Sequence, residues 1–385
     1  MRIALVIERM RPERGGRERS VAQIAVELAA RGHDVTILCQ EGELDSPGVE
    51  TLDLGRAGAT RAQQLAGFVR AVAGAIQRER YDIVHATLAV PGANVYQPRG
   101  GTVPGLRAAR ERMAACPVCR LWGRLTFPLN RARMLAWTHE RRLAADAKVT
   151  CVAVSRMLAD EFAAYYGRRE NVAVVYNGVT VPKLDEAQRS AWRRQWRSRW
   201  NAPETAPVFL CVAHNFALKG VPETVAAFAA FLSGRKQGDP AAQAHLVIVG
   251  GDRPGRDLRA AADRLSGRVT FEPAVEDVFP LYSAAEAVVL LSWQDACSRT
   301  VLEALRWGVP SLTTRYNGAH EILGEAGVVI DSPRDTGAAA AGLADLADPV
   351  SRQKMVAACR EKADFAGMKR QVDELVRVYE QTLEK

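Results

Sequence analysis

Short apolar runs alternate with longer amphipathic stretches along most of the chain. The apolar run 1–6 precedes a stretch, 20–31, whose apolar residues are spaced three and four positions apart, and Gly32 separates it from the next apolar run, 35–39. This pattern predicts a strand, a helix that ends at a glycine, and a second strand. Because the unit recurs, the sequence predicts parallel sheets with helical crossovers between their strands.

The alternation stops after Gly178 and resumes at residue 208, which predicts two domains. We interpret 180–206, which is rich in Arg and Trp and contains prolines, as the connection between them, including one short helix. The fold class is therefore α/β, with two doubly wound, Rossmann-like parallel-sheet domains facing a central cleft. The predicted divisions are an amino-terminal domain 1–180, a carboxy-terminal domain 181–364, and a last helix 365–385 that returns to the first domain.

Composition and charge narrow the class of protein. The 385 residues are 48% hydrophobic and 25% charged, as in globular proteins, and carry a formal net charge of +8. Excess positive charge favours anionic partners such as nucleotides, phosphorylated glycans or acidic membrane surfaces. The first residues lack the pattern of a signal peptide, and no apolar run reaches the roughly 18 residues that a membrane span needs. The seven scattered cysteines suit a reducing compartment, so we expect a cytoplasmic protein.

In each domain, a glycine-containing loop follows the first predicted strand. Gly15 and Gly16 precede a helix whose free N–H groups attract phosphate, although an ordinary loop explains them equally well. They do not form a G-x-G-x-x-G motif, which argues against a nicotinamide or flavin cofactor. In the second domain, Lys219 precedes Gly220 and a helix, where its ammonium group either meets a diphosphate or is simply solvated.

The segment 292–310 carries the strongest signal. Asp295 ends a loop after a predicted strand, and Glu303 lies eight positions later inside the following helix. A carboxylate accepts hydrogen bonds from two hydroxyl groups, so Glu303 suits a ribose diol, and the amides of 297–299 open the helix and suit phosphate. The spacing alone leaves open that Asp295 only caps the helix.

These residues together resemble the retaining glycosyltransferases of family four. The two acids, followed by Ala304 and by Gly308 and Pro310, look like the hallmark of that family. Further similar segments follow in the same order along the chain, at 31–35, 154–155, 176–179, 249–252 and 269–291. Within the family, segments 91–96 and 250–254 look most similar to the lipopolysaccharide-core glucosyltransferases.

The resemblance implies the GT-B fold, a nucleotide diphosphate sugar as substrate, and neither metal nor cofactor. It assigns Asp295 to the donor sugar, Glu303 to the nucleotide ribose and Lys219 to the diphosphate. The implied catalytic residues are Asp295, Lys219, His85 and Asn94. The implied donor-binding residues are Gly15, Gly16, His214, Asn215, Lys219, Gly250, Asp252, Cys297, Ser298, Arg299, Thr300 and Glu303. Retention of configuration is a family property, described as front-face attack assisted by the leaving phosphate.

The chain departs from the family pattern at four positions. Asp295 replaces the usual Glu, Leu218 stands where an Arg is usual, and Ser298 stands where a Gly is usual. Asn94 replaces an acid near the acceptor and cannot act as a general base, so either His85 or the leaving phosphate takes the proton. A non-catalytic sugar-nucleotide-binding protein and an epimerase of the same fold therefore remain alternatives to a hexosyltransferase.

The segment 99–142 holds ten arginines against two glutamates, interleaved with Leu, Phe and Trp. It predicts a basic amphipathic insertion that lies on anionic lipid headgroups or binds acceptor phosphates, unless it is only a solvated face. No nucleic-acid recognition motif accompanies it. Together with this segment, the family resemblance implies transfer of a hexose, with UDP-glucose as the leading donor, to a membrane-linked glycan or lipid acceptor. We expect the protein to be peripheral, at the inner face of the cytoplasmic membrane.

Overall fold

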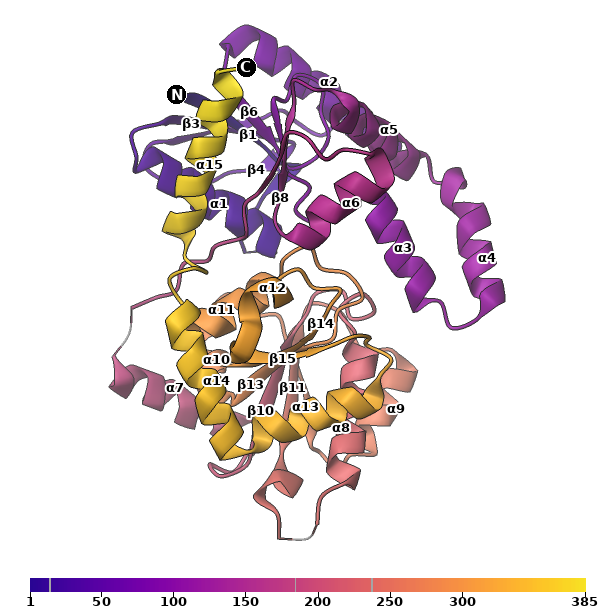
Figure 1. Ribbon diagram of the computed structural model, residues 1–385, viewed down its shortest axis with the longest axis vertical. Helices are drawn as coiled ribbons and strands as arrows, with labels where there is room; N and C mark the ends of the chain where they lie inside the picture. Colours follow the sequence, from indigo (N-terminus) through magenta and orange to yellow (C-terminus); the bar gives the residue numbers. More distant parts are fainter. Residues whose placement is uncertain (14, 184, 237) are drawn as a thin grey trace. The chain divides into compact units, whose positions relative to one another are not determined.

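The computed structural model describes residues 1–13, 15–183, 185–236 and 238–385 (Figure 1). The chain forms two compact units. Unit 1 comprises Met1–Gly178 and Met368–Lys385, and unit 2 comprises Val179–Gly367. The boundaries predicted from the sequence are 180 and 364. None of the helices in the described ranges combines the length and the hydropathy needed to cross a bilayer.

Unit 1 is built on a seven-stranded sheet with the order β5-β3-β1-β6-β7-β8-β9, in which all neighbours are parallel. Its strands are β1 (Arg2–Val6), β3 (Asp34–Cys39), β5 (Val49–Asp53), β6 (Ile83–Ala86), β7 (Val95–Tyr96), β8 (Thr150–Ala153) and β9 (Val172–Val174). A separate small sheet pairs β2 (Arg9–Met10) with β4 (Glu41–Gly42). The strand order reverses between β1 and β6.

Helices cover both faces of this sheet because successive side chains of a strand point to opposite sides. On β1, Ile3 and Leu5 pack with α1 (Gly16–Ala29) and α15 (Met368–Leu383), whereas Ala4 and Val6 pack with α2 (Arg61–Glu79). Figure 1 shows α15 alongside α1. The other helices of unit 1 are α3 (Val103–Met113), α4 (Pro117–Thr126), α5 (Arg131–Ala145), α6 (Arg156–Tyr166) and the 3₁₀ turn η1 (Phe127–Leu129).

Unit 2 contains a six-stranded parallel sheet with the order β12-β11-β10-β13-β14-β15, which is the strand order of a Rossmann fold. The strands are β10 (Val208–Val212), β11 (His245–Gly250), β12 (Val269–Pro273), β13 (Ala287–Leu290), β14 (Ser311–Thr314) and β15 (Gly327–Ile330). The helices are α7 (Glu186–Arg199), α8 (Val221–Ser233), α9 (Arg256–Asp263), α10 (Phe279–Ala284), α11 (Arg299–Trp307), α12 (His320–Leu323), α13 (Thr336–Ala347) and α14 (Pro349–Lys362), with the 3₁₀ turns η2 (Pro240–Gln243) and η3 (Gly324–Ala326). The predicted α/β class with two doubly wound sheets is confirmed.

The interpretation of 180–206 as a connection with a short helix needs correction. Its helix, α7, is 14 residues long and belongs to the body of unit 2. Trp192, Trp196 and Trp200 recur every four residues and therefore share one face, which packs on the core under β10 and α11. On the same helix, Arg197 is 1% exposed and donates hydrogen bonds to the carbonyl oxygens of Ala284 and Ala206 at 3.1 and 3.0 Å.

Candidate functional site

The strand order of unit 2 reverses between β10 and β13, so the loops that follow these strands diverge at the carboxyl edge of the sheet. Ligands of doubly wound folds bind in the crevice at such a point. The loop after β10 carries Lys219, and the loop after β13 carries Asp295. The two loops are joined by a hydrogen bond from the Trp293 N–H to the Leu218 carbonyl at 2.9 Å. The crevice thus brings together two residues that lie far apart in the sequence.

Lys219 and Asp295 form an ion pair between Nζ and Oδ2, and their side chains are 23% and 14% exposed. The backbone of Asp295 is held by the loop after β14. Its N–H donates to the Tyr316 carbonyl at 2.8 Å, and its carbonyl accepts from the Gly318 N–H at 2.8 Å. The charge of Lys219 is therefore balanced by a carboxylate whose position is set by a third loop.

Two glycines allow these loops to approach so closely. Gly220 has a φ of +68°, and a Cβ there would lie 1.9 Å from the carbonyl oxygen of Leu291. A Cβ on Gly250 would lie 1.8 Å from the carbonyl oxygen of Ala213. The chains leaving β10, β11 and β13 therefore pack backbone against backbone, which only glycine permits.

The other donor-binding residues predicted in the first loops of the second domain lie at the carboxyl ends of β10 and β11, at the same edge of the sheet. Asp252 accepts a hydrogen bond from the Phe216 N–H at 2.9 Å, and Asn215 accepts one from the Leu218 N–H at 3.1 Å. His214 is exposed, and a Cβ on Gly251 would lie 3.4 Å from its Nδ1. Asp252 and Asn215 thus shape the loop, while His214 presents its ring to solvent.

Helix α11 begins at this crevice. It follows Cys297 and Ser298, which are buried, and the side chain of Ser298 makes no capping hydrogen bond. Thr300, in the first turn, is half-buried. Helix α8 also begins, at Gly220, without a side-chain cap. Uncapped helix starts leave N–H groups and the positive end of the helix dipole directed outward, which favours an anion.

Glu303 lies on the second turn of α11 and is 6% exposed. Its Oε1 accepts a hydrogen bond from Arg299 at 3.2 Å, and its Oε2 accepts one from the Tyr282 hydroxyl at 3.2 Å. Burial and, secondly, the Glu303 charge raise the pKa of Tyr282 well above its ordinary value, so the phenol stays protonated and donates. The carboxylate is therefore fixed in orientation from two sides.

Sequence reasoning missed Tyr282 and Asn317, which support these acids. Tyr282 lies on α10, whose short length gave little periodic signal. Asn317 accepts hydrogen bonds from the N–H groups of Ser298 and Ala319 at 3.1 and 3.2 Å, and so fixes the residue before α11. An Asn-Gly pair directly after a predicted strand is the signal that marks Asn317 as a loop-forming residue.

In unit 1, Gly15 and Gly16 lie at the corresponding reversal, after β1. Gly15 precedes α1 in an extended conformation, Gly16 is the first helical residue, and no side chain caps the helix. The start of α1 is thus earlier than the predicted 20–31. Ser20, which the sequence placed at the helix start, is instead buried within it.

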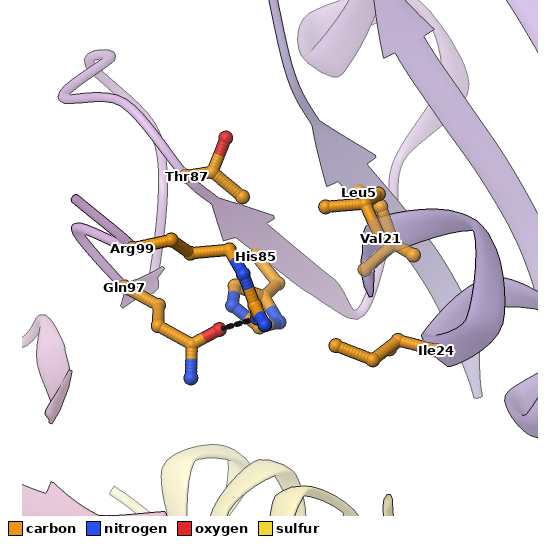
Figure 2. A pocket seen from close by; sticks show the side chains of 7 residues that line it. All are labelled: Leu5, Val21, Ile24, His85, Thr87, Gln97 and Arg99. Carbon is orange, nitrogen blue, oxygen red and sulfur yellow. Dashed lines mark hydrogen bonds between the residues drawn. The ribbon is translucent and has the colours of Figure 1, made fainter. Parts of the chain in front are cut away.

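His85, on β6, is buried at the side of the sheet that α1 covers (Figure 2). Its Nδ1 lies 2.6 Å from the Tyr379 hydroxyl of α15, and its Nε2 has no hydrogen-bond partner among the described residues. Burial and, secondly, Arg99 lower the pKa of His85 to about 3. A buried imidazole of such low basicity is a poor general base, which argues against the catalytic function predicted for it.

Asn94 joins the beginnings of two neighbouring strands of the sheet. Its Oδ1 accepts from the Val84 N–H at 2.8 Å, and its Nδ2 donates to the Asp82 carbonyl at 2.9 Å. Because Asp82 and Asn94 immediately precede the parallel strands β6 and β7, Asn94 lies at the amino edge. Its amide connects the first residues of two strands, and the function near an acceptor that the resemblance implies for it stays a prediction.

Gln97 and Arg99, which follow β7 at the carboxyl edge, were not identified as special from the sequence. Arg99 is 8% exposed and donates to Gln97 Oε1 at 2.6 Å (Figure 2). It also donates to Asn177 Oδ1 at 2.6 Å and to Ser20 Oγ. A small cavity of about 10 Å³, room for about one water molecule, adjoins these residues. Its lining comprises Leu5, Val21, Ile24, His85, Thr87, Gln97 and Arg99. No signal in the sequence distinguishes Arg99 from the other arginines of 99–142.

The basic insertion presents an apolar surface on α4. This helix has no buried residue, and Figure 1 shows it standing away from the sheet of unit 1. Val118, Leu121, Trp122 and Leu125 are between 58% and 76% exposed. Arg124 pairs with Glu111 at 2.7 Å, which links α4 to α3. Within the described part of the chain, no group of three or more His, Cys, Asp or Glu side chains is placed to bind a metal ion.

Comparisons with known proteins agree with this architecture. Residues 14–182 match the family model Glycosyltransferase Family 4, and residues 206–348 match the model Glycosyl transferases group 1. The lipopolysaccharide glucosyltransferase WaaG of Escherichia coli (strain K12) is 27% identical over 329 residues, which is 83% of this chain and 82% of WaaG.

Solved structures show the same fold. A crystal structure of WaaG, a glycosyltransferase involved in lipopolysaccharide biosynthesis, has a TM-score of 0.79 and 22% identity, covering 98% of this chain and 99% of that one. The Anabaena protein HepE in complex with UDP-glucose has a TM-score of 0.69 and 18% identity, covering 100% and 98%. The expected GT-B fold is therefore confirmed.

Proposed function

Because this chain belongs to the glycosyltransferases of family four, we propose that it transfers glucose from UDP-glucose to a membrane-linked glycan or lipid acceptor, with retention of configuration. The observation that carries the proposal is the arrangement of Lys219, Asp295 and Glu303 around one crevice of unit 2. The similarity to WaaG, a lipopolysaccharide glucosyltransferase, supports an acceptor in lipopolysaccharide or other cell-envelope polysaccharide synthesis. The UDP-glucose bound to HepE, which has the same fold, supports the donor.

Each group of the crevice suits one part of a nucleotide sugar. Lys219 and the uncapped starts of α8 and α11 offer positive charge and N–H groups to the diphosphate. Glu303, oriented by Arg299 and Tyr282, offers acceptor oxygens to the ribose hydroxyls. When the diphosphate replaces Asp295 as the ion-pair partner of Lys219, the Asp295 carboxylate can accept hydrogen bonds from the sugar.

The reaction breaks the bond between the sugar C1 and the diphosphate oxygen and forms a bond from C1 to the acceptor oxygen on the same face. The acceptor proton passes to the leaving phosphate, because His85 is buried and weakly basic and Asn94 cannot accept it. Charge develops on the leaving phosphate, where Lys219 and the helix amides are already directed. We therefore propose that these groups make a metal ion unnecessary.

The first test is nucleotide binding by thermal shift and calorimetry against UDP, ADP, GDP and CDP, on wild type and Glu303→Ala. UDP alone is expected to stabilise the wild type, and the variant is expected to lose most of that stabilisation. Asp345→Ala, which removes an exposed acid of α13, is the matched control. Binding of no nucleotide, or equal binding by wild type and Glu303→Ala, contradicts the assignment of the crevice.

Turnover distinguishes the alternative functions. Release of UDP from UDP-glucose only when an acceptor is present, with an α-linked product by NMR and no loss in EDTA, supports a metal-independent retaining transferase. Conversion of UDP-glucose without any acceptor would instead identify an epimerase. Tight UDP binding without turnover on any acceptor would identify a non-catalytic sugar-nucleotide-binding protein.

We also propose that α4 attaches the protein to the inner face of the cytoplasmic membrane. Its exposed Leu and Trp side chains suit the headgroup boundary, and Arg120 and Arg124 on the same helix suit anionic lipids. Sedimentation with phosphatidylglycerol-containing vesicles should be lost in Leu121→Ser/Trp122→Ser. Val350→Ser, an equally exposed apolar position on α14, should sediment like the wild type. Equal sedimentation of the α4 variant and the wild type would contradict this attachment.

A further inference from the structure

A cavity of unit 2 whose lining includes neither Lys219, Asp295 nor Glu303 has a volume of about 520 Å³. Stripes from two helices form two of its walls, Glu186, Arg189, Ser190 and Arg193 on α7 and Val356, Arg360 and Ala363 at the end of α14. Their spacings of three, four and seven positions place each stripe on one helix face. The remaining walls are Tyr282, Ser283 and Ala285 at α10 and Arg306, Trp307, Gly308 and Val309 at the end of α11.

Four arginines but only one acid, Glu186, line this cavity. Arg193 is already paired, with Glu286 at 2.8 Å and with Glu204 at 3.3 Å. Among the residues that the structure describes, no carboxylate lies within ion-pairing distance of Arg189, Arg306 or Arg360. Three guanidinium groups from three helices therefore surround one space without forming an ion pair. The charge of Asp364, which does not line the cavity, acts on Arg306 from a longer distance.

Two of these groups are held in place by the fold. The guanidinium carbon of Arg189 lies 3.9 Å from the centre of the Trp307 ring, and its Nη1 donates to the Trp307 carbonyl at 3.3 Å. Arg306 donates through Nη1 to the Val179 carbonyl at 2.5 Å, while its Nε is buried and has no partner among the described residues. Burying a guanidinium N–H without an acceptor is costly, so an anion that supplies one would be bound favourably.

We propose that this cavity is a binding site for a phosphate group, carried by a small organic phosphate or present as free inorganic phosphate. A phosphate offers three terminal oxygens and up to two negative charges, which three guanidinium groups from separate helices satisfy together. A carboxylate has only two oxygens and one charge. The volume is within the range of about 300–1,000 Å³ that small-molecule sites occupy. The inference is independent of the proposed transferase function, because none of these arginines belongs to the crevice at Lys219.

The site is nevertheless linked to the crevice by one side chain. Tyr282 lines the cavity, and its hydroxyl donates to Glu303 at 3.2 Å. Trp307 and Glu303 also lie on the same helix, α11. A ligand that displaces Arg189 from the Trp307 carbonyl therefore acts on the end of the helix that carries the proposed ribose ligand.

The test is isothermal titration calorimetry of the full chain in chloride buffer of low ionic strength, with glucose 6-phosphate and inorganic phosphate as the two probes. Lys219→Met serves as the background, so that binding at the crevice does not contribute. Arg189→Gln/Arg360→Gln removes two cavity charges. Arg194→Gln/Lys354→Gln removes the same charge from exposed positions of α7 and α14 that do not line the cavity.

In the Lys219→Met background, Arg189→Gln/Arg360→Gln is expected to raise the Kd for the bound probe at least about tenfold. Arg194→Gln/Lys354→Gln is expected to leave that Kd within about twofold of the Lys219→Met value. Tighter binding of glucose 6-phosphate than of inorganic phosphate identifies an organic phosphate as the ligand, and the reverse identifies free phosphate. Equal affinities in the cavity and matched variants overturn the proposal, as does the absence of saturable binding for both probes. UDP binding to wild type and Glu303→Ala is measured separately, so a failure of the proposed nucleotide site is distinguished from a failure of the phosphate cavity.

Discussion

The ion pair of Lys219 and Asp295 leads to the prediction that removing an acid of the proposed site tightens nucleotide binding. Asp295→Asn should strengthen the binding of UDP, although it removes a residue proposed to contact the sugar. In this structure Lys219 is neutralised by Asp295, so a diphosphate must compete with that carboxylate for the ammonium group. The amide preserves the shape of the side chain and removes the competing charge. Transfer of glucose should fall at the same time, because the amide accepts fewer hydrogen bonds from the sugar hydroxyls.

The magnitude follows from the partial exposure of the pair. Two unit charges about 4 Å apart interact by about 4 kcal/mol at an effective dielectric constant of about 20. The side chains are 23% and 14% exposed, so water screens the pair and its net value is nearer 1–2 kcal/mol. Asp295→Asn should therefore lower the Kd for UDP by about 5- to 30-fold. Lys219→Met removes the cation and leaves the carboxylate beside the diphosphate, so it should raise the Kd by about 30- to 150-fold.

Calorimetric titration with UDP on wild type, both single variants and the double variant measures these changes. The double variant should bind UDP more tightly than Lys219→Met and more weakly than the wild type, because it lacks both the cation and the carboxylate that repels the diphosphate. Asp345→Asn, which removes an exposed acid elsewhere in unit 2, controls for the change in net charge. An Asp295→Asn variant that binds UDP no better than the wild type would refute the competition argument.

Three further predictions concern stability and support of the site. Gly220→Ala should lower the free energy of unfolding by about 3 kcal/mol or more, since its Cβ would lie 1.9 Å from the Leu291 carbonyl at a φ of +68°. Chemical denaturation checks this, with Gly234→Ala, whose Cβ would meet nothing closer than 3.7 Å, as the tolerated control. Tyr282→Phe should raise the Kd for UDP by about 3- to 10-fold, because Glu303 loses one orienting hydrogen bond. Calorimetry measures this Kd, and a value equal to that of the wild type would show that Tyr282 contributes packing alone. Burial lowers the pKa of His85 to about 3 in the folded state, so between that value and about 6.5 the unfolded chain binds the extra proton and stability falls as the pH drops. Urea unfolding near pH 7 and pH 5 should show a loss of up to about 1.4 kcal/mol per pH unit, and the loss should be smaller in His85→Gln.

The sequence predicted long or strongly patterned elements well. Strand β10 begins at residue 208, where the apolar pattern resumes, because buried parallel strands are continuous apolar runs, and helix α11 ends just before Gly308. Strand β7 was missed because it has only two residues, which carry no periodicity. The connection 180–206 was misinterpreted because its arginines mask an apolar face that only three tryptophans form.

The candidate site was predictable only where chemistry and spacing coincide. Asp295 and Glu303 stand out because both belong to one strand-loop-helix segment. The pairing of Lys219 with Asp295 depends on which strands are neighbours, and no local pattern encodes that order. The contacts of Asn94 with the beginnings of β6 and β7 were not predictable, because the two-residue strand β7 carries no periodic signal. Arg99 differs from the other basic residues only in its burial, which depends on contacts with Ser20 and Asn177 from distant segments.

Helix α15 has a consequence for the order in which the protein is made. Met368, Val372, Leu375 and Tyr379 complete the core of a unit whose other residues belong to the first 178 of the chain. A ribosome must therefore translate all of unit 2 before unit 1 has its last helix. During that interval the part of the α1 side of the first sheet that α15 covers is exposed, whereas unit 2, a single continuous segment, has everything it needs to fold. The unit synthesised first is thus the one that matures last, and a message truncated near its end would leave that unit exposed to chaperones and proteases.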